Sequence, residues 1–131
     1  MTDSTIPCEQ TFVLTQEDFD RFARLSGDHN PIHVDPEFSA RTSFGQTVSH
    51  GMLLFSVVRS LLAQNWPGAT LQTQSLMFPA PAYAGKTLQL VVEEQRREGP
   101  ELYLKTTITG PDDETCLAGE CQLTLSTKEA S

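Results

Sequence analysis

The chain has 131 residues, of which 38% are hydrophobic and 20% are charged. This composition is typical of one compact globular domain and excludes a disordered or fibrous protein. The formal net charge of −8 makes nucleic acid an unsuitable partner, because an acidic surface repels phosphate groups.

The sequence predicts neither a membrane-spanning helix nor a secretory signal. The longest apolar run, residues 52–55, is far shorter than the roughly 20 residues that a membrane-spanning helix needs. The first ten residues show no basic stretch followed by an apolar one, so we expect no secretory signal. We therefore expect a single domain over residues 1–131, located in the cytoplasm and without a membrane partner.

The chain contains three cysteines, Cys8, Cys116 and Cys121. The odd number and the absence of CxxC spacing argue against a disulfide framework and against a zinc site. We expect these cysteines to be ordinary buried residues, and we expect no metal and no organic cofactor.

The first third of the chain predicts a short strand and then a helix. Residues 10–14 alternate in a strand-like way, and Thr15 has the character of a helix N-cap with acidic residues just after it. The helix is expected to run to about Leu25 and to end at Gly27. Residues 28–33 are predicted to form a loop around Pro31, before a second, short helix that begins at Asp35-Pro36 and reaches about Thr42.

Residues 51–63, GMLLFSVVRSLLA, are apolar on nearly every side. A helix of this kind is expected to be surrounded by other structure rather than to lie on a surface. Residues Asn65, Pro67 and Gly68 are expected to end it.

The second half of the chain changes to a strand-like period. Four segments rich in β-branched residues are separated by turns too short to hold crossover helices, so the strands are expected to form an antiparallel sheet. A buried helix with such a sheet wrapped around it predicts an α+β protein with the hot-dog arrangement. The exposed edges of a single sheet favour a homodimer. The four expected strands are Thr70–Phe78, Thr87–Gln95, Leu102–Thr109 and Thr115–Ser126.

Polar and special residues are concentrated between Ser26 and Asp35. Asp28 and His33 lie five residues apart in a segment stiffened by Pro31, a spacing that lets both side chains share one water molecule. From spacing alone, a turn-forming Asp28 and a half-buried structural His33 are the preferred interpretation, because short Asp/His pairs are common in loops.

A second cluster, Ser49-His50-Gly51-Met52, lies where the apolar helix begins. The unpaired amides of a helix N-terminus stabilise negative charge, and Gly51 has no side chain to obstruct a thioester oxygen. For His50, capping or packing is the preferred interpretation over catalysis.

The run ARLSGDHNPIHVDPEFSARTSFGQTVSHGML, residues 23–53, resembles the signature of the MaoC-like, or (R)-specific enoyl-CoA hydratase, family. The resemblance implies the hot-dog fold and a reversible syn addition of water to a trans-2-enoyl-CoA, giving an (R)-3-hydroxyacyl-CoA. It implies that Asp28 and His33 are the catalytic pair, that Asn30 orders them, and that the Gly51 amide receives the thioester oxygen. The residues expected to contact the acyl-CoA substrate are Asn30, Ser49, His50, Met52, Phe55 and Phe78.

Three alternatives stay open at this point. A hot-dog thioesterase would need a carboxylate on the apolar helix, which has none. A non-catalytic hot-dog partner subunit would not need the Asp28 and His33 pair. A dehydratase that acts on a 3-hydroxyacyl thioester of CoA or of acyl carrier protein uses the same chemistry in reverse, and fold and motif do not separate it from a hydratase.

Overall fold

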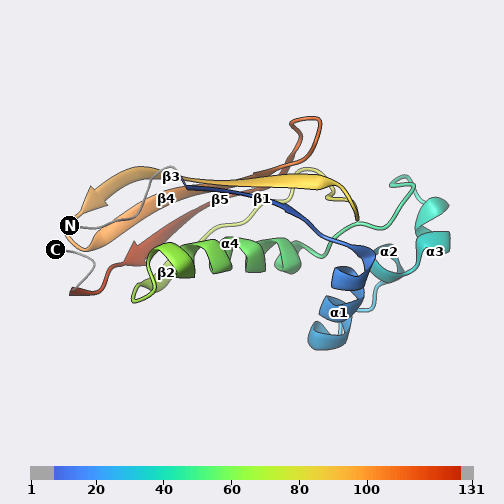
Figure 1. Cartoon of the computed structure of the whole chain (residues 1–131), viewed down its shortest axis with the longest axis horizontal. Helices are drawn as coiled ribbons and strands as arrows, with labels where there is room; N and C mark the ends of the chain where they lie inside the picture. Colours follow the sequence, from blue (N-terminus) through green and yellow to red (C-terminus); the bar gives the residue numbers. More distant parts are fainter. Residues whose placement is uncertain (1–7, 128–131) are drawn as a thin grey trace.

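The computed structural model describes residues 8–127, which form one antiparallel five-stranded sheet with a long helix along one face (Figure 1). The strand order in the sheet is β1-β3-β4-β5-β2, so β1 and β2 are the edges. The elements are β1 (Cys8–Val13), α1 (Gln16–Ser26), α2 (Pro31–Val34), α3 (Pro36–Ala40), α4 (Gly51–Asn65), β2 (Thr70–Gln74), β3 (Thr87–Glu98), β4 (Glu101–Thr109) and β5 (Thr115–Thr124).

The hydrophobic core lies between α4 and the sheet. The helix buries Leu54, Val58, Leu61 and Leu62, which recur at helical spacing on one face. The strands supply alternate buried residues, as the pattern of β4 shows, where every second side chain from Leu102 to Ile108 is fully buried. Each layer therefore covers the apolar face of the other.

The described chain covers α4 less completely than its nearly all-round apolar sequence predicted. The sheet covers one side of the helix, while Met52, Ser56, Ser60 and Ala63 are exposed on the other. The helix is apolar all round in sequence, but one sheet of five strands is too small to close around it. Its outer face is left uncovered.

Helices α1, α2 and α3 gather beyond the N-terminal end of α4 (Figure 1). The caps predicted from sequence are confirmed. Thr15 forms a capping box with Asp18, Gly27 ends α1 in the left-handed conformation, and Asp35 caps α3 with Pro36 in its first position.

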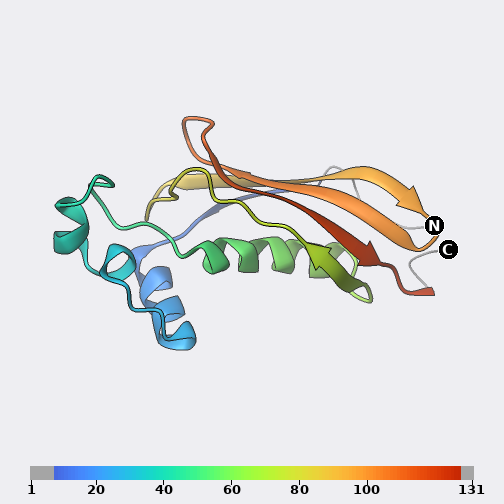
Figure 2. The same ribbon diagram turned by 180° about the vertical axis from the view of Figure 1, so that it is seen from behind.

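Two predicted boundaries need correction. The segment predicted as a loop at residues 28–33 contains a helical turn, α2, because Asn30 caps it and Pro31 occupies its first position. The strand predicted to run to Phe78 ends at Gln74. Beyond it the chain makes only an isolated bridge, from Met77 to Ala118, before returning alongside α4 to β3 (Figure 2).

Within residues 8–127, none of the helices is long and apolar enough to cross a membrane. The three cysteines are unpaired and buried, as the sequence predicted.

Candidate active site

Asp28 and His33 face each other across a short gap. Gly27 turns the chain out of α1 just before Asp28, and the α2 turn then brings His33 back towards it. The distance from Asp28 Oδ2 to His33 Nε2 is 3.9 Å. The Asp28 side chain is 53% exposed and that of His33 only 11%, so the gap between them is open on the Asp28 side.

The tautomer of His33 is determined by its backbone contact. His33 Nδ1 lies 2.8 Å from the carbonyl oxygen of Val48. A carbonyl oxygen only accepts, so Nδ1 carries the hydrogen and, in the neutral ring, Nε2 is left as an acceptor facing Asp28. The site therefore presents an imidazole lone pair beside a carboxylate.

Asn30 organises the turn between the two side chains. Its backbone N–H donates to Asp28 Oδ1 at 3.2 Å, and its own Oδ1 accepts from the N–H of Ile32 at 3.1 Å. The first bond orients the carboxylate and the second caps α2. Asn30 thus acts on the geometry of the pair from within the turn.

Gln16, which the sequence did not single out, fastens this turn to α1. Its Nε2 donates to the carbonyl oxygen of His33 at 2.9 Å and to Asp20 Oδ1 at 3.1 Å. Its Oε1 accepts from Thr47 Oγ1 at 2.6 Å. Gln16 lies 17 residues from His33 and 31 from Thr47, so no local sequence signal could have shown this role.

His50 is the third polar member of the cluster and is 2% exposed. Its ring stacks on that of His33, with centroids 3.8 Å apart and planes inclined by 25°, and it also contacts the ring of Phe22. His50 Nε2 lies 3.0 Å from the carbonyl oxygen of Asp28. Although His50 is at the N-cap position of α4, its side chain makes no capping bond there.

Gly51 begins α4 next to this cluster. Within residues 8–127, no acceptor is found for its backbone N–H. A Cβ atom at Gly51 would lie 2.9 Å from the ring of Phe78. The ring therefore stands directly against the glycine, and a side chain at this position would displace it.

The other predicted substrate contacts are placed less deeply than expected. Met52 and Phe78 are 54% and 44% exposed, so neither is buried in the hydrophobic core. Phe55 is half-buried and packs against the core, and Ser49 donates from Oγ to the carbonyl oxygen of His50 at 2.9 Å. Leu53 and Ser56 line an open groove of about 340 Å³ between α1 and α4.

Asp28, His33 and His50 bring potential metal-ligand atoms within 4.8 Å of one another. Imidazole lone pairs lie in the ring planes, however, and the planes of His33 and His50 are stacked nearly parallel. Their lone pairs do not converge on one ion at the roughly 2 Å that a metal–nitrogen bond requires. The donor set therefore does not fit a metal centre, and its chemistry is that of acid–base groups.

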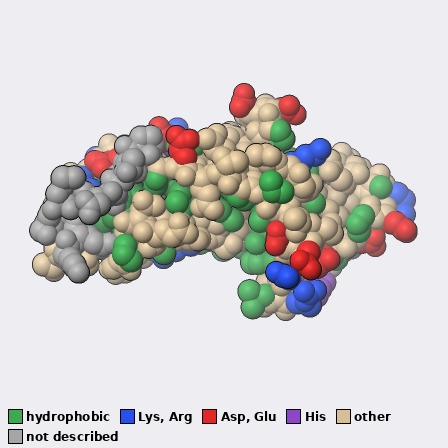
Figure 3. Space-filling model, viewed as in Figure 1, with side chains coloured by type: hydrophobic (Ala, Val, Ile, Leu, Met, Phe, Trp, Pro, Cys, Tyr) green, Lys and Arg blue, Asp and Glu red, His purple; other side chains and the backbone are tan. Residues whose placement is uncertain are grey.

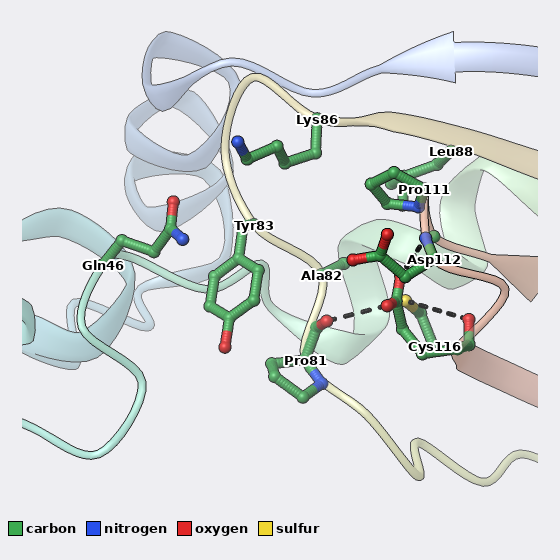
Figure 4. A pocket seen from close by; sticks show the side chains of 11 residues that line it. Gln46, Pro81, Ala82, Tyr83, Lys86, Leu88, Pro111, Asp112 and Cys116 are labelled. Carbon is green, nitrogen blue, oxygen red and sulfur yellow. Dashed lines mark hydrogen bonds between the residues drawn. The ribbon is translucent and has the colours of Figure 1, made fainter.

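A cavity of about 530 Å³ lies beside this cluster, between the segment that leads into β3 and the β4–β5 hairpin (Figure 4). Figure 4 shows Tyr83 and Lys86 on one wall and Asp112 and Cys116 on the other. None of Asp28, His33 and His50 lines it. Val48, whose carbonyl oxygen accepts from His33, forms a bridge with Tyr83, which lines the cavity.

Comparisons with known proteins agree with this architecture. The family described as MaoC like domain matches residues 2–110. The chain is 38% identical over 108 residues to the (R)-specific enoyl-CoA hydratase of Aeromonas caviae, covering 79% of this chain and 81% of that protein. A solved (R)-hydratase from A. caviae, described as involved in PHA biosynthesis, superposes with a TM-score of 0.87 at 32% identity, over 95% of this chain and 97% of that one. These likenesses confirm the predicted hot-dog fold.

A second relative is the mitochondrial 3-hydroxyacyl-(acyl-carrier-protein) dehydratase of Arabidopsis thaliana. It is 36% identical over 96 residues, which are 72% of this chain. The matched region is 58% of the length of that relative, so the likeness concerns only part of it.

Proposed function

The chain belongs to the MaoC-like domain family, and from that premise we propose that it is an (R)-specific enoyl-CoA hydratase. It adds water reversibly to a trans-2-enoyl-CoA and forms an (R)-3-hydroxyacyl-CoA. The observation that carries this proposal is the 3.9 Å gap between Asp28 Oδ2 and His33 Nε2, the ring nitrogen that is an acceptor in the neutral imidazole. We further propose that residues 1–131 form one domain of this kind, working in the cytoplasm, where its unpaired cysteines stay reduced.

The gap between the two acceptors matches one water molecule. A water oxygen at about 2.8 Å from each acceptor, an ordinary hydrogen-bond distance, donates one hydrogen to each. Both hydrogens are then engaged, and the lone pairs of the oxygen point away from the pair. A water held in this way is oriented to attack the C3 atom of an enoyl thioester placed opposite.

The proton transfers balance within the pair. As the water oxygen bonds to C3, His33 Nε2 takes one proton, and the C2–C3 π electrons move towards the thioester oxygen as an enolate. The Asp28 carboxylate stabilises the imidazolium that forms. The pair then returns the proton to C2, so that one molecule of water has been added and both groups are regenerated. Because both groups lie on one side of the substrate, the addition is syn.

The developing enolate oxygen needs a donor. The Gly51 N–H is suited to this role, because it stands free at the N-terminus of a 15-residue helix whose dipole favours negative charge. The space that a Gly51 side chain would take is filled by the Phe78 ring, so this ring borders the approach of the thioester to the Gly51 N–H. We place the thioester between Gly51 and the water site.

The experiment that tests this function uses purified protein and crotonyl-CoA, with loss of the enoyl-thioester absorbance as the signal. The C3 configuration of the product is read with a stereospecific dehydrogenase, and longer trans-2-enoyl-CoAs follow. Rapid loss that yields the (R)-alcohol is expected. A product of the (S) configuration, or no turnover of any enoyl thioester, would contradict the proposal and favour a non-catalytic partner role.

The relative from Arabidopsis thaliana supports a second candidate, dehydration of a 3-hydroxyacyl group on acyl carrier protein. The same pair would catalyse this reverse reaction. The net charge of −8 disfavours an acidic carrier, and acidic side chains crowd the tip of the β4–β5 hairpin (Figure 3). Comparing kcat/KM for crotonyl-CoA with that for crotonyl-acyl carrier protein separates the two, and we expect the CoA ester to be preferred.

We propose that the molecule is a homodimer. β2 is a sheet edge, and Met77, just beyond it, is 64% exposed. Phe78 and the outer face of α4 add further exposed apolar surface. A second copy would cover these surfaces and the unpaired edge together.

A further inference from the structure

His50 is a buried polar residue that the reaction described above does not use. Its ring is packed between elements: His33 of α2 stacks on it at 3.8 Å, and Phe22 of α1 lies 4.8 Å away, measured between ring centroids. The titratable groups that face it are Asp28, His29 and His33. Because His50 contacts His33, the proposed base, both the charge and the tautomer of His50 affect His33.

Backbone contacts determine which nitrogen of each ring carries the hydrogen. His50 Nε2 lies 3.0 Å from the carbonyl oxygen of Asp28, which only accepts, so the hydrogen is on Nε2. His50 Nδ1 is buried and has no hydrogen-bond partner among the described residues. His33 has the opposite arrangement, with the hydrogen on Nδ1. The two stacked rings therefore hold opposite tautomers.

We propose that His50 is a positioning residue for the Asp28 and His33 pair, acting as a neutral imidazole of fixed tautomer. Its Nε2–H holds the Asp28 backbone, and its ring face sets the plane of His33. This inference rests on the proposed hydratase function and adds a third residue to it. His50 acts through the other two and is assigned no contact with substrate.

The neutral state of His50 follows from its surroundings. A proton on Nδ1 would place a cation with an unpaired N–H in the interior. Burial is the main cause that lowers the pKa of the His50 imidazole, and the charges of His33 and His29 act in the same direction. The hydrogen bond to the Asp28 carbonyl and the Asp28 carboxylate oppose them. A neutral ring against His33 also favours the imidazolium that His33 becomes, whereas a second cation would repel it.

The direct test is nuclear magnetic resonance of protein labelled with 15N-histidine, because the chain has only three histidines. His29→Gln and His50→Gln assign the three sets of signals by their loss. Near pH 7.5 we expect His33 to show the Nδ1–H pattern and His50 the Nε2–H pattern. A doubly protonated His50, or one tautomer shared by both rings, would overturn the proposal. The spectra need no turnover, so this result is separate from the fate of the proposed function.

Two variants then separate the two roles of His50. His50→Gln keeps an N–H donor for the Asp28 carbonyl but loses the ring, while His50→Phe keeps a ring but loses the donor. We expect each to lower kcat on the order of 10- to 100-fold with KM changed by less than about threefold, because displaced catalytic groups cost this much. His33 keeps its Nδ1–H pattern in both variants, because Val48 holds it, but its ring signals are expected to shift in His50→Gln, which removes the stacked ring. The matched control is His29→Gln, which replaces the exposed neighbouring histidine and should leave kcat unchanged.

A packing role alone for His50 would give a different result. If both variants fold and keep the wild-type kcat, and His50→Gln leaves the His33 signals in place, His50 is a packing residue and no more. If His50→Phe does not fold, the wild-type spectra and His50→Gln still decide.

Discussion

Backbone atoms hold the functional side chains of this site. His33 is fixed by the carbonyl oxygen of Val48, His50 by that of Asp28, and the Asp28 carboxylate by the N–H of Asn30. Because the partner is a backbone carbonyl oxygen, Val48 binds His33 although its own side chain is apolar. In His33 and Asp28, the backbone contact leaves one polar atom of the ring or carboxylate free for chemistry.

Substitutions at Asp28 and His33 test the pair. Asp28→Asn keeps an oxygen for the Asn30 N–H but removes the charge. His33→Asn keeps an N–H for Val48 but removes the acceptor Nε2. We expect each to lower kcat on crotonyl-CoA by about 100- to 10,000-fold, the usual loss for an acid–base group. The exposed Glu37→Gln is the control. Near-normal kcat in either folded variant would refute the assignment, and circular dichroism establishes folding.

His50 makes a prediction about pH and stability. Its pKa in the folded protein is lower than the ordinary value of 6.5, so below pH 6.5 the unfolded chain binds a proton that the native state resists. The stability linked to His50 is therefore complete above pH 6.5 and decreases as the pH falls towards the folded value. Urea unfolding at pH 7.5 and 5.5 should show a larger loss for the wild type than for His50→Gln. An equal loss in both proteins would contradict this.

Among the elements, the approach of the chain after β2 to β5 depends on one glycine. A Cβ atom at Gly119 would lie 2.0 Å from the backbone carbonyl oxygen of Ser75, which cannot move without breaking the bonds on either side. Gly119→Ala is expected to lower the free energy of unfolding by about 2–3 kcal/mol. Urea denaturation measures this loss. Lys105→Ala, an exposed change on β4, should change it by less than about 0.5 kcal/mol, and equal effects would exclude the steric explanation.

The helices could be predicted because their signals are local. Thr15, Asp35 and Pro36 act on backbone groups within three residues, so the caps and starts of α1 and α3 are visible in the sequence, whereas the single turn α2 at Pro31 was not predicted. The end of β2 could not be predicted, because apolar residues continue beyond Gln74 as far as Phe78. What stops the strand is the geometry of its pairing with β5, where the register already shifts between Leu71 and Thr73.

Part of the candidate site could likewise be predicted from the sequence, and part could not. The motif in residues 23–53 contains Asp28, Asn30, His33 and Gly51, so these residues could be selected from the sequence. The stacking of His50 on His33 and the bond from Gln16 to His33 join residues 17 apart, which no local pattern reports. The carbonyl of Val48 has no sequence signature at all.

At the scale of the whole molecule, one five-stranded sheet leaves the outer face of α4 and the edge of β2 uncovered. A dimer through this surface should have a mass twice the 14.5 kDa of one chain. Size-exclusion chromatography with light scattering measures it. Met77→Glu, at the proposed interface, should shift the mass towards one chain, because a charge is costly to bury there. The comparison variant Leu25→Glu replaces an apolar residue exposed on α1 and should leave the mass unchanged. A single-chain mass for the wild type would refute the dimer.

The central claim is that one water, held by two groups on the same side of the substrate, is added to the double bond. The most direct measurement is the hydration of crotonyl-CoA in deuterium oxide, stopped early, with proton NMR of the product. Because Asp28 and His33 lie 3.9 Å apart on one side, deuterium should enter C2 only on the face that carries the new 3-hydroxyl group. Deuterium on the opposite face, or on both, would require a proton donor that this pair cannot supply and would contradict the mechanism.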